Sequence, residues 1–348
     1  MTYSRPGDRA GALRLHLNEN TGGCSAAVVE AIRQISTEDI AQYPDYAALS
    51  RDCAEYLGVR ETQLVLTNGL DEGLMALTVN AFSVVPVADA RPEAVIPTPA
   101  FEMYSVFVKA SGGRVVSIPP NPDFSFQTQK VCDAVTDRTR IVFLTNPNNP
   151  TGQLIPRDAI REIARCLPPD VTIVLDEAYY DFCGETFLPE LDAHPNVIIG
   201  RTFAKAHGLA GLRAGCLIGN AGRLEAVRSA VPPYSLSVFA AAGWRAALRD
   251  RVYLDWYRGQ VDESRELLYA ACERLSLPYW KSAGNFVLIN VARSGEPQEI
   301  VRAFGDRGIL VRDRSHDPGC RGCIRITAGV VRHTEMAIDA LEGLCAVP

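Results

Sequence analysis

The chain has 348 residues, of which 47% are hydrophobic and 22% are charged, and its formal net charge is −6 at pH 7. This is the balance of a globular protein long enough for two domains, and no basic cluster indicates nucleic-acid binding. No apolar run approaches the roughly 20 residues that span a bilayer, and residues 1–8 lack the apolar centre of a signal peptide. We therefore expect a cytoplasmic protein that binds neither nucleic acid nor membrane.

Seven short apolar runs, rich in β-branched residues, alternate with helical patterns over the first two thirds of the chain. They are residues 64–66, 94–96, 115–118, 141–144, 172–175, 197–199 and 214–218. Continuously apolar runs predict strands that are buried on both faces, and the helical patterns between them supply the crossovers. The sequence thus predicts an α/β fold, with a mostly parallel sheet sandwiched by helices.

The pattern changes after about residue 235. A helical stretch from Ser237 to about Leu275 precedes a region with two further strand-like runs, residues 286–290 and 324–327. We expect a large domain at 41–235 and a smaller α+β domain that combines residues 1–40 with 236–348.

The ten cysteines form no disulfide framework in the sequence. Cys166, Cys216 and Cys272 stand in apolar runs, as small buried hydrophobic residues do. Cys320 and Cys323 have the spacing of a metal or redox pair, but no second pair accompanies them, and the five histidines are dispersed. We expect no metal site.

Polar clusters follow four of the predicted strands, at residues 67–72, 146–152, 176–179 and 201–205. The carboxyl ends of parallel strands are where open α/β sheets bind ligands. The sequence therefore predicts a ligand site at this edge of the sheet.

Lys205 is one of only four lysines, and Arg213 follows it by eight positions. A lysine amine forms a Schiff base with an aldehyde cofactor, and an arginine holds a phosphate as a bidentate fork. The pair suits pyridoxal 5′-phosphate (PLP). The alternative is a surface lysine near the start of a helix.

Asp176 ends a buried strand, where a carboxylate is costly unless it is paired. The protonated pyridine nitrogen of PLP is one partner, and a helix N-cap is the other interpretation. Tyr179 and Asn149 can each donate a hydrogen bond to the phenolate oxygen of the ring, although Asn149 also suits a turn.

The phosphate of PLP would lie at the start of a helix, where free backbone N–H groups favour an anion. The residues that we expect to hold it are Gly69, Leu70, Asp71, Thr202 and Arg213. Either Phe101 or Tyr104 would stack on the ring, with core packing as the alternative for each. Arg325, flanked by apolar residues in a strand, would bind a substrate carboxylate or form a structural salt bridge.

Three motifs together resemble the fold type I PLP aminotransferases, and most closely the histidinol-phosphate aminotransferase branch. They are Asn-Pro-Asn-Asn-Pro-Thr-Gly at 146–152, Asp-Glu-Ala-Tyr at 176–179, and Arg-Thr-Phe-Ala-Lys with Leu-Ala-Gly-Leu-Arg at 201–213. The resemblance runs from about residue 13 to 345. It implies a large PLP-binding domain, a smaller domain, and transfer of an amino group from histidinol phosphate or a related aromatic or imidazole donor to a 2-oxo acid such as 2-oxoglutarate.

The resemblance also implies further site residues. Asn20, in Leu-Asn-Glu-Asn, and the arginines Arg312 and Arg325 would bind substrate. Tyr43 would reach the PLP phosphate of a neighbouring subunit, in a homodimer with shared active sites. Lys205, once free, would move a proton as general base and acid.

Two positions depart from the branch. Residues 21–23 are Thr-Gly-Gly where the branch has Pro-Tyr-Gly, and Ala204 stands where a serine is usual. We therefore expect weaker discrimination for the substrate phosphate and fewer contacts to the cofactor phosphate. The alternatives are an aromatic amino-acid aminotransferase and a decarboxylase of the threonine-phosphate type. A non-catalytic regulatory domain and a nicotinamide dehydrogenase fit less well, because no added basic segment and no Gly-x-Gly-x-x-Gly is present.

Overall fold

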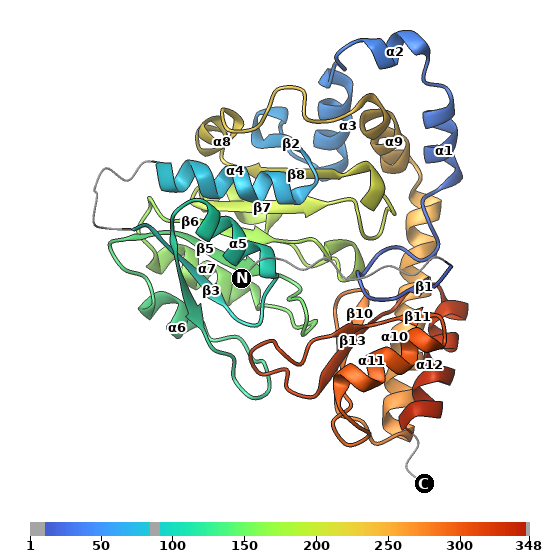
Figure 1. The fold of residues 1–348 in the computed structure, drawn as a ribbon. Coiled ribbons are helices and arrows are strands. Elements are labelled where there is room, and N and C mark those ends of the chain that lie inside the picture. The colour runs from blue at the N-terminus through green and yellow to red at the C-terminus, as the bar shows by residue number, and fades with distance from the viewer. Residues whose placement is uncertain (1–10, 84–90, 346–348) are drawn as a thin grey trace.

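The computed structural model describes residues 11–83 and 91–345, so the N-terminal residues 1–8, where we expect no signal peptide, lie outside the described part. A seven-stranded sheet, in the order β2-β8-β7-β6-β5-β3-β4, forms the centre of the larger unit (Figure 1). Its strands are β2 (Leu64–Asn68), β3 (Glu93–Pro97), β4 (Arg114–Ile118), β5 (Thr139–Thr145), β6 (Thr172–Asp176), β7 (Val197–Thr202) and β8 (Ala214–Gly219). Among these seven strands β8 runs opposite to the other six, because it pairs antiparallel with both β2 and β7 while the remaining pairs are parallel. The predicted α/β fold, with its seven strands and mostly parallel sheet, is confirmed.

Helices cover both faces of this sheet (Figure 1). On one face lie α4 (Leu70–Ser83), α5 (Glu102–Ala110) and α8 (Ala221–Arg228). On the other lie α1 (Ala26–Arg33), α3 (Ala47–Leu57), α6 (Thr128–Asp133), α7 (Arg157–Cys166) and α9 (Val238–Arg249), with α2 (Thr37–Ala41) between α1 and α3. Along β6, Val174 packs into the first layer, whereas Ile173 and Leu175 pack into the second. Both sets of alternating residues are buried, which is why these strands read as continuous apolar runs.

A second, antiparallel sheet belongs to the smaller unit and has the order β12-β13-β10-β9. Its strands are β9 (Tyr279–Trp280), β10 (Phe286–Asn290), β12 (Arg312–Asp313) and β13 (Cys323–Thr327). The helices beside it are α10 (Arg251–Arg274), α11 (Pro297–Asp306) and α12 (Val331–Cys345) (Figure 1). The N-terminal β1 (Leu13–Arg14) pairs with β11 (Ile309–Leu310). This pairing attaches the start of the described chain to the smaller unit.

The boundaries of the two domains stay a prediction. The hydrophobic cores show which unit each segment packs against. Val28 of α1 and Trp244 of α9 belong to the core of the large sheet, while Leu15 belongs to the core of the smaller unit. The helical stretch from Ser237 is two helices and not one. Asp250 separates them, because its side chain accepts a hydrogen bond from the backbone N–H of Tyr253 (3.0 Å) and caps α10.

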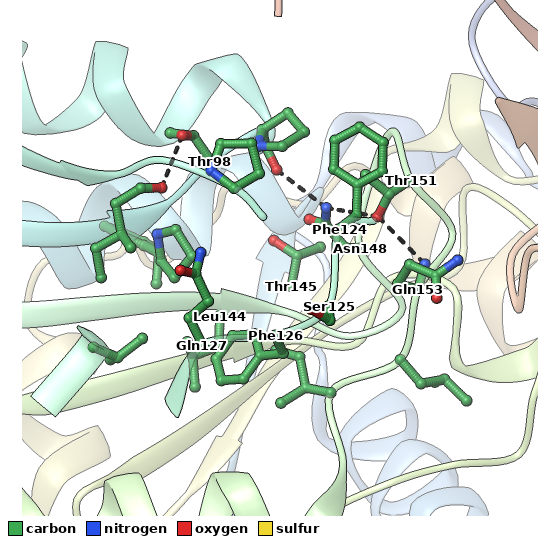
Figure 2. Close-up of a pocket in the computed structure, with 18 residues that line it drawn as sticks. Thr98, Phe124, Ser125, Phe126, Gln127, Leu144, Thr145, Asn148, Thr151 and Gln153 are labelled. Carbon is green, nitrogen blue, oxygen red and sulfur yellow. Dashed lines mark hydrogen bonds between the residues drawn. The ribbon is translucent and has the colours of Figure 1, made fainter. Parts of the chain in front are cut away.

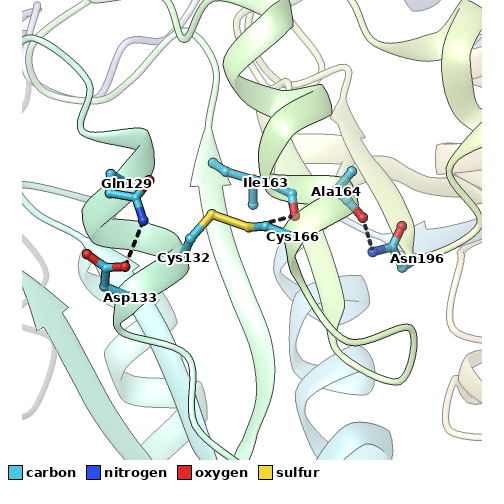
Figure 3. Close-up of a disulfide and its surroundings, with 7 residues drawn as sticks. All are labelled: Gln129, Cys132, Asp133, Ile163, Ala164, Cys166 and Asn196. Atoms are coloured by element: carbon cyan, nitrogen blue, oxygen red, sulfur yellow. Dashed lines mark hydrogen bonds between the residues drawn. A yellow bond between two sulfur atoms is a disulfide. The ribbon is translucent and has the colours of Figure 1, made fainter.

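Cys166 departs from the prediction of a buried thiol. It is exposed at the end of α7 and forms a disulfide with Cys132 of α6, 34 positions earlier (Figure 3). The apolar stripe of α7 passes through Ile160 and Ile163, and position 166 lies off that stripe. Spacing alone could not pair these cysteines, since their approach depends on how α6 and α7 pack.

The other cysteines named in the sequence are thiols buried as expected. Cys216 and Cys272 are both 0% exposed, and Cys320 and Cys323 are buried as well. Within residues 11–83 and 91–345, no three His, Cys, Asp or Glu side chains come together as a metal site would need. In the same ranges, no helix combines the length and the apolar character needed to cross a membrane.

Candidate active site

A cavity of about 730 Å³ lies where the carboxyl ends of β5, β6 and β7 meet the segment 14–19 and the strands β12 and β13. It brings together most of the residues predicted from the sequence. Those that line it are Leu70, Asp71, Phe101, Asn149, Asp176, Tyr179, Thr202, Lys205, Arg213, Arg312 and Arg325. Gly69 precedes the helix that borders the cavity. Tyr43, Tyr104 and Asn20 do not line it.

Lys205 enters the cavity from the segment after β7. Its Nζ donates a hydrogen bond to the backbone oxygen of Leu17 (2.9 Å). Burial lowers the pKa of Lys205 to about 8, and the positive charge of Arg325 adds to the shift. A lysine with such a pKa holds a useful fraction of neutral amine near neutral pH, as a nucleophile requires.

Asp176, the last residue of β6, is only 4% exposed. Its Oδ2 accepts a hydrogen bond from the hydroxyl of Tyr104 (2.5 Å), and its Oδ1 accepts one from the backbone N–H of Ala178 (3.0 Å). Burial raises the pKa of Asp176 to about 6. No ion pair joins Asp176 to any of the described residues. A buried carboxylate held only by neutral donors suits a cationic partner, such as the protonated pyridine nitrogen of PLP.

The hydroxyl of Tyr179 lies between two amides. It accepts hydrogen bonds from Asn149 Nδ2 (3.2 Å) and from Asn18 Nδ2 (3.0 Å). Asn149 Oδ1 in turn accepts a hydrogen bond from Arg325 Nη1, and Arg325 Nη2 donates to the backbone oxygen of His16 (2.7 Å). Asn149 and Tyr179 therefore belong to one hydrogen-bond network with Arg325. A residue that served only a turn would not need these side-chain contacts.

Asn18 is a site residue that the sequence does not single out. The resemblance pointed to Asn20 of the same Leu-Asn-Glu-Asn motif. In the structure Asn20 Nδ2 donates to the backbone oxygen of Ala206 (2.8 Å), and its Oδ1 accepts from the N–H of Gly22 (2.8 Å). Asn18 has φ +54°. Asn tolerates this left-handed backbone better than most residues. A backbone angle cannot be read from the sequence, so the sequence held no signal for Asn18.

The start of α4 forms the far end of the cavity. Gly69 has φ +77°, and a Cβ at this position would lie 2.5 Å from Arg213 Nη2. Arg213 Nη2 pairs with Asp71 Oδ2 (2.9 Å), and its backbone oxygen accepts from the N–H of Gly69 (2.6 Å). Glycine thus allows a guanidinium to lie against the N-terminus of a helix. This combination fits the phosphate of PLP.

Only one of the two aromatic candidates lines the cavity. Phe101 does so, directly before α5. Tyr104 is 1% exposed, stacks on Phe143 with ring centroids 4.7 Å apart, and directs its hydroxyl at Asp176. Phe101 is therefore better placed to stack on a cofactor ring, and Tyr104 to support Asp176.

Tyr43 lies outside the cavity. It is 79% exposed and stacks on Tyr234, with ring centroids 4.3 Å apart. Nothing within the described part of this single chain brings Tyr43 to the cavity. A role there would require another subunit.

A smaller cavity, of about 60 Å³, shares Thr145 with the main one (Figure 2). Asn148 lies in it and donates hydrogen bonds to the backbone oxygen of Pro99 (3.1 Å) and to Thr151 Oγ1 (3.0 Å). The described residues that line it include no charged side chain. The charged groups that chemistry needs are therefore in the larger cavity.

Known proteins resemble this chain over nearly its whole length. The family model for aminotransferase class I and II matches residues 10–341. The histidinol-phosphate aminotransferase of Anoxybacillus flavithermus is 33% identical over 342 residues, which cover 95% of this chain and 88% of that protein. That of Moorella thermoacetica is 33% identical over 341 residues, covering 96% and 86%.

Solved structures have the same fold. The histidinol-phosphate aminotransferase of Sinorhizobium meliloti, solved in complex with pyridoxal-5′-phosphate, superposes with a TM-score of 0.85 at 28% identity, covering 97% of this chain and 91% of that one. The aspartate aminotransferase of Thermus thermophilus with maleate has a TM-score of 0.81 at 23% identity, covering 96% and 92%, and supports the fold alone. The resemblance found in the sequence is confirmed, and the chain belongs to the aminotransferase class I and II family.

Proposed function

We propose that this aminotransferase uses PLP on Lys205 to move an amino group from a phosphorylated amine, of the histidinol-phosphate kind, to a 2-oxo acid such as 2-oxoglutarate. The observation that carries the proposal is the convergence of Lys205, Asp176 and Tyr179 on one cavity that also holds Arg213 and Arg325. The amine, the buried carboxylate and Arg213 are the groups that a pyridine aldehyde with a phosphate requires, and Arg325 is left for a substrate carboxylate.

Each residue has a separate task. Bound PLP supplies an electron sink for the bond that breaks at the donor's Cα. The carboxylate of Asp176 would pair with the protonated ring nitrogen, and Tyr179 and Asn149 would donate toward the ring oxygen. The amine of Lys205 would act as the base that takes the proton from the donor's Cα and as the acid that returns one. Arg325 binds the carboxylate of the 2-oxo acid.

The choice of donor rests on the opposite end of the cavity. Arg312 lines it and would meet the donor's phosphate. Residues 21–23 are Thr-Gly-Gly and so offer no phenol, and none of them lines the cavity. Thr21 Oγ1 accepts the N–H of Val330 (2.8 Å), and a Cβ at Gly22 would lie 3.1 Å from the ring of Trp256. We therefore expect this enzyme to discriminate less sharply between phosphorylated donors and aromatic or unphosphorylated ones.

A homodimer with shared active sites is part of the proposal. Tyr43 and Tyr234 are 79% and 56% exposed, and Ile40 beside them is 56% exposed. Exposed aromatic and aliphatic side chains grouped in this way are typical of protein contacts. A second subunit would cover them and bring Tyr43 to the PLP phosphate of its partner.

Borohydride reduction tests the assignment of Lys205. Purified enzyme should be yellow, lose this colour with borohydride, and carry a pyridoxyl group on Lys205 in peptide mapping. Lys205→Ala should abolish turnover, whereas the matched control Lys281→Ala should keep it. A pyridoxyl group on Lys109, Lys130 or Lys281 would overturn the assignment.

A screen of half-reactions then tests the donor. The cofactor absorbance is followed as histidinol phosphate, phenylalanine and histidine are added. We expect the kcat/KM for histidinol phosphate to exceed those for phenylalanine and histidine by less than about a thousand-fold. A strong preference for phenylalanine would favour an aromatic amino-acid aminotransferase, and release of CO₂ would favour a decarboxylase.

A further inference from the structure

Glu102, the first residue of α5, places its carboxylate between two arginines of the smaller unit. Its Oε1 lies 3.3 Å from Arg314 Nη1 and 3.6 Å from Arg312 Nη2. All three residues line the cavity. The side chain of Glu102 is 40% exposed, whereas those of Arg312 and Arg314 are 20% and 7% exposed. The carboxylate is therefore the most solvent-accessible of the three groups, and Arg314 is the most buried.

A second partner holds Arg314 in place. Arg314 Nε pairs with Asp317 Oδ2 (2.5 Å), and Asp317 does not line the cavity. This ion pair anchors the guanidinium from behind, so that Nη1 remains directed at Glu102. Removal of Glu102 from the arginines would leave Arg314 still paired and still in position.

The charges near this end of the cavity do not balance. The three arginines Arg312, Arg314 and Arg325 contact two carboxylates, Glu102 and Asp317, because Arg325 bonds the neutral Asn149 and a backbone oxygen. Asp313 turns its Oδ1 to the N–H and hydroxyl of Ser315. The carboxylate of Asp313 pairs with none of the three arginines, so by these contacts the uncompensated positive charge rises from one to two if Glu102 leaves. Two positive charges match a phosphate dianion.

We propose that Glu102 is a resident anion that occupies the place of the donor's phosphate, and that Arg314 binds this phosphate together with Arg312 once Glu102 has moved away. The proposal rests on the proposed function and names the residues that set its specificity. A phosphate offers two charges and several acceptor oxygens to the arginines, so it can replace a single carboxylate. A donor without a distal anion leaves Glu102 paired. Glu102 thus competes with the donor's phosphate for Arg312 and Arg314.

The test compares two donors that differ only in the phosphate, histidinol phosphate and histidinol. The ratio of their kcat/KM values is measured for the holoenzyme and its variants. Glu102→Gln removes the competing charge, so the ratio should rise about three-fold or more through a lower KM for histidinol phosphate, with kcat little changed. Glu162→Gln, which removes an exposed charge on α7 outside the cavity, is the matched control and should leave the ratio unchanged.

Arg314→Gln should lower the same ratio about ten-fold or more by raising the KM for histidinol phosphate alone. Because this variant leaves Asp317 without its partner, Arg314→Gln with Asp317→Asn, and Arg314→Lys, are made beside it. The double variant should lose the phosphate preference and remain folded, and Arg314→Lys should recover part of it. In Arg314→Gln the gain from Glu102→Gln should become smaller, since both act on one anion site.

Inorganic phosphate supplies a readout that does not depend on the donor's chemistry. It should inhibit the half-reaction with histidinol more strongly in Glu102→Gln than in the wild type. An unchanged ratio and unchanged inhibition in Glu102→Gln, or equal losses for both donors in Arg314→Gln, would overturn the inference. If histidinol phosphate, histidinol and glutamate all fail to convert the cofactor, it is the proposed function that fails.

Discussion

The hydroxyl of Tyr104 donates a hydrogen bond of 2.5 Å to Oδ2 of Asp176, although the two residues are 72 positions apart. Both are buried, and Thr145 Oγ1 lies 2.9 Å from the same hydroxyl. Tyr104 therefore acts on the carboxylate of Asp176 and does not line the cavity itself. The hydrogen bond lowers the pKa of Asp176 against the upward effect of burial.

Tyr104→Phe should leave Asp176 with one donor fewer in a buried site. The loss is worth about 1–3 kcal/mol, and we expect kcat to fall about ten-fold or more because the ring nitrogen is held protonated less firmly. Tyr279→Phe is the control, since its hydroxyl bonds Glu273 at the surface (2.9 Å). Equal kcat values for the two variants would show that Tyr104 serves only packing.

Asp176→Asn should stabilise the protein when PLP has been removed. The folded-state pKa of Asp176 is raised to about 6 from 3.8, so its contribution to stability is present below pH 3.8 and is lost as the pH rises through about 6. At pH 8 the charged carboxylate costs up to about 3 kcal/mol. Urea unfolding of the cofactor-free proteins should show a gain of about 1–3 kcal/mol at pH 8 and a smaller gain at pH 5.

Bound PLP should reverse this order, because the carboxylate then has a cationic partner that asparagine cannot replace. In the holoenzyme Asp176→Asn should unfold at a lower temperature than the wild type and should turn over at least a hundred-fold more slowly. The idea fails if the variant is the less stable protein in both states, or if it turns over at the wild-type rate.

Gly69→Ala should weaken PLP binding about ten-fold or more. The new Cβ would lie 2.5 Å from Arg213 Nη2, at a residue with φ +77°, so the guanidinium must leave the N-terminus of α4. Gly58→Ala is a matched control, with φ +69° and no atom within 4 Å of the new Cβ. Both variants should lose about 1 kcal/mol of stability from the backbone, but only Gly69→Ala should raise the Kd for PLP. Similar Kd values for PLP in both variants would show that Arg213 does not bind the phosphate.

Mixed subunits should test whether active sites are shared. Inactive Lys205→Ala chains and weakened Tyr43→Phe chains should regain activity when they exchange, because one of the two sites in a heterodimer then has both residues intact. The mixture is assayed after exchange has been verified by native mass spectrometry. Activity no higher than the mean of the separate variants would argue for sites built from one chain.

The sequence predicted the central strands of the large sheet because they are buried on both faces, whereas the edge strand β4 is only partly buried. Val174 and its neighbours Ile173 and Leu175 serve opposite cores, so no polar residue interrupts the run. The polar groups that follow the strands could be placed as well, because the carboxyl ends of parallel strands lie at one edge of the sheet. Lys205, Asp176 and Asn149 were found in this way, and the cavity contains all three.

The sequence by itself determined the kind of fold, the edge of the sheet that carries the site, and the family. These depend on local periodicity and on motifs that lie within a few residues. Only the tertiary structure decided that Tyr104 supports Asp176, that Asn18 and not Asn20 bonds Tyr179, that Cys132 pairs with Cys166, and that Glu102 lies between Arg312 and Arg314. Each of these contacts joins elements far apart in the chain, and spacing along a sequence carries no information on how such elements pack.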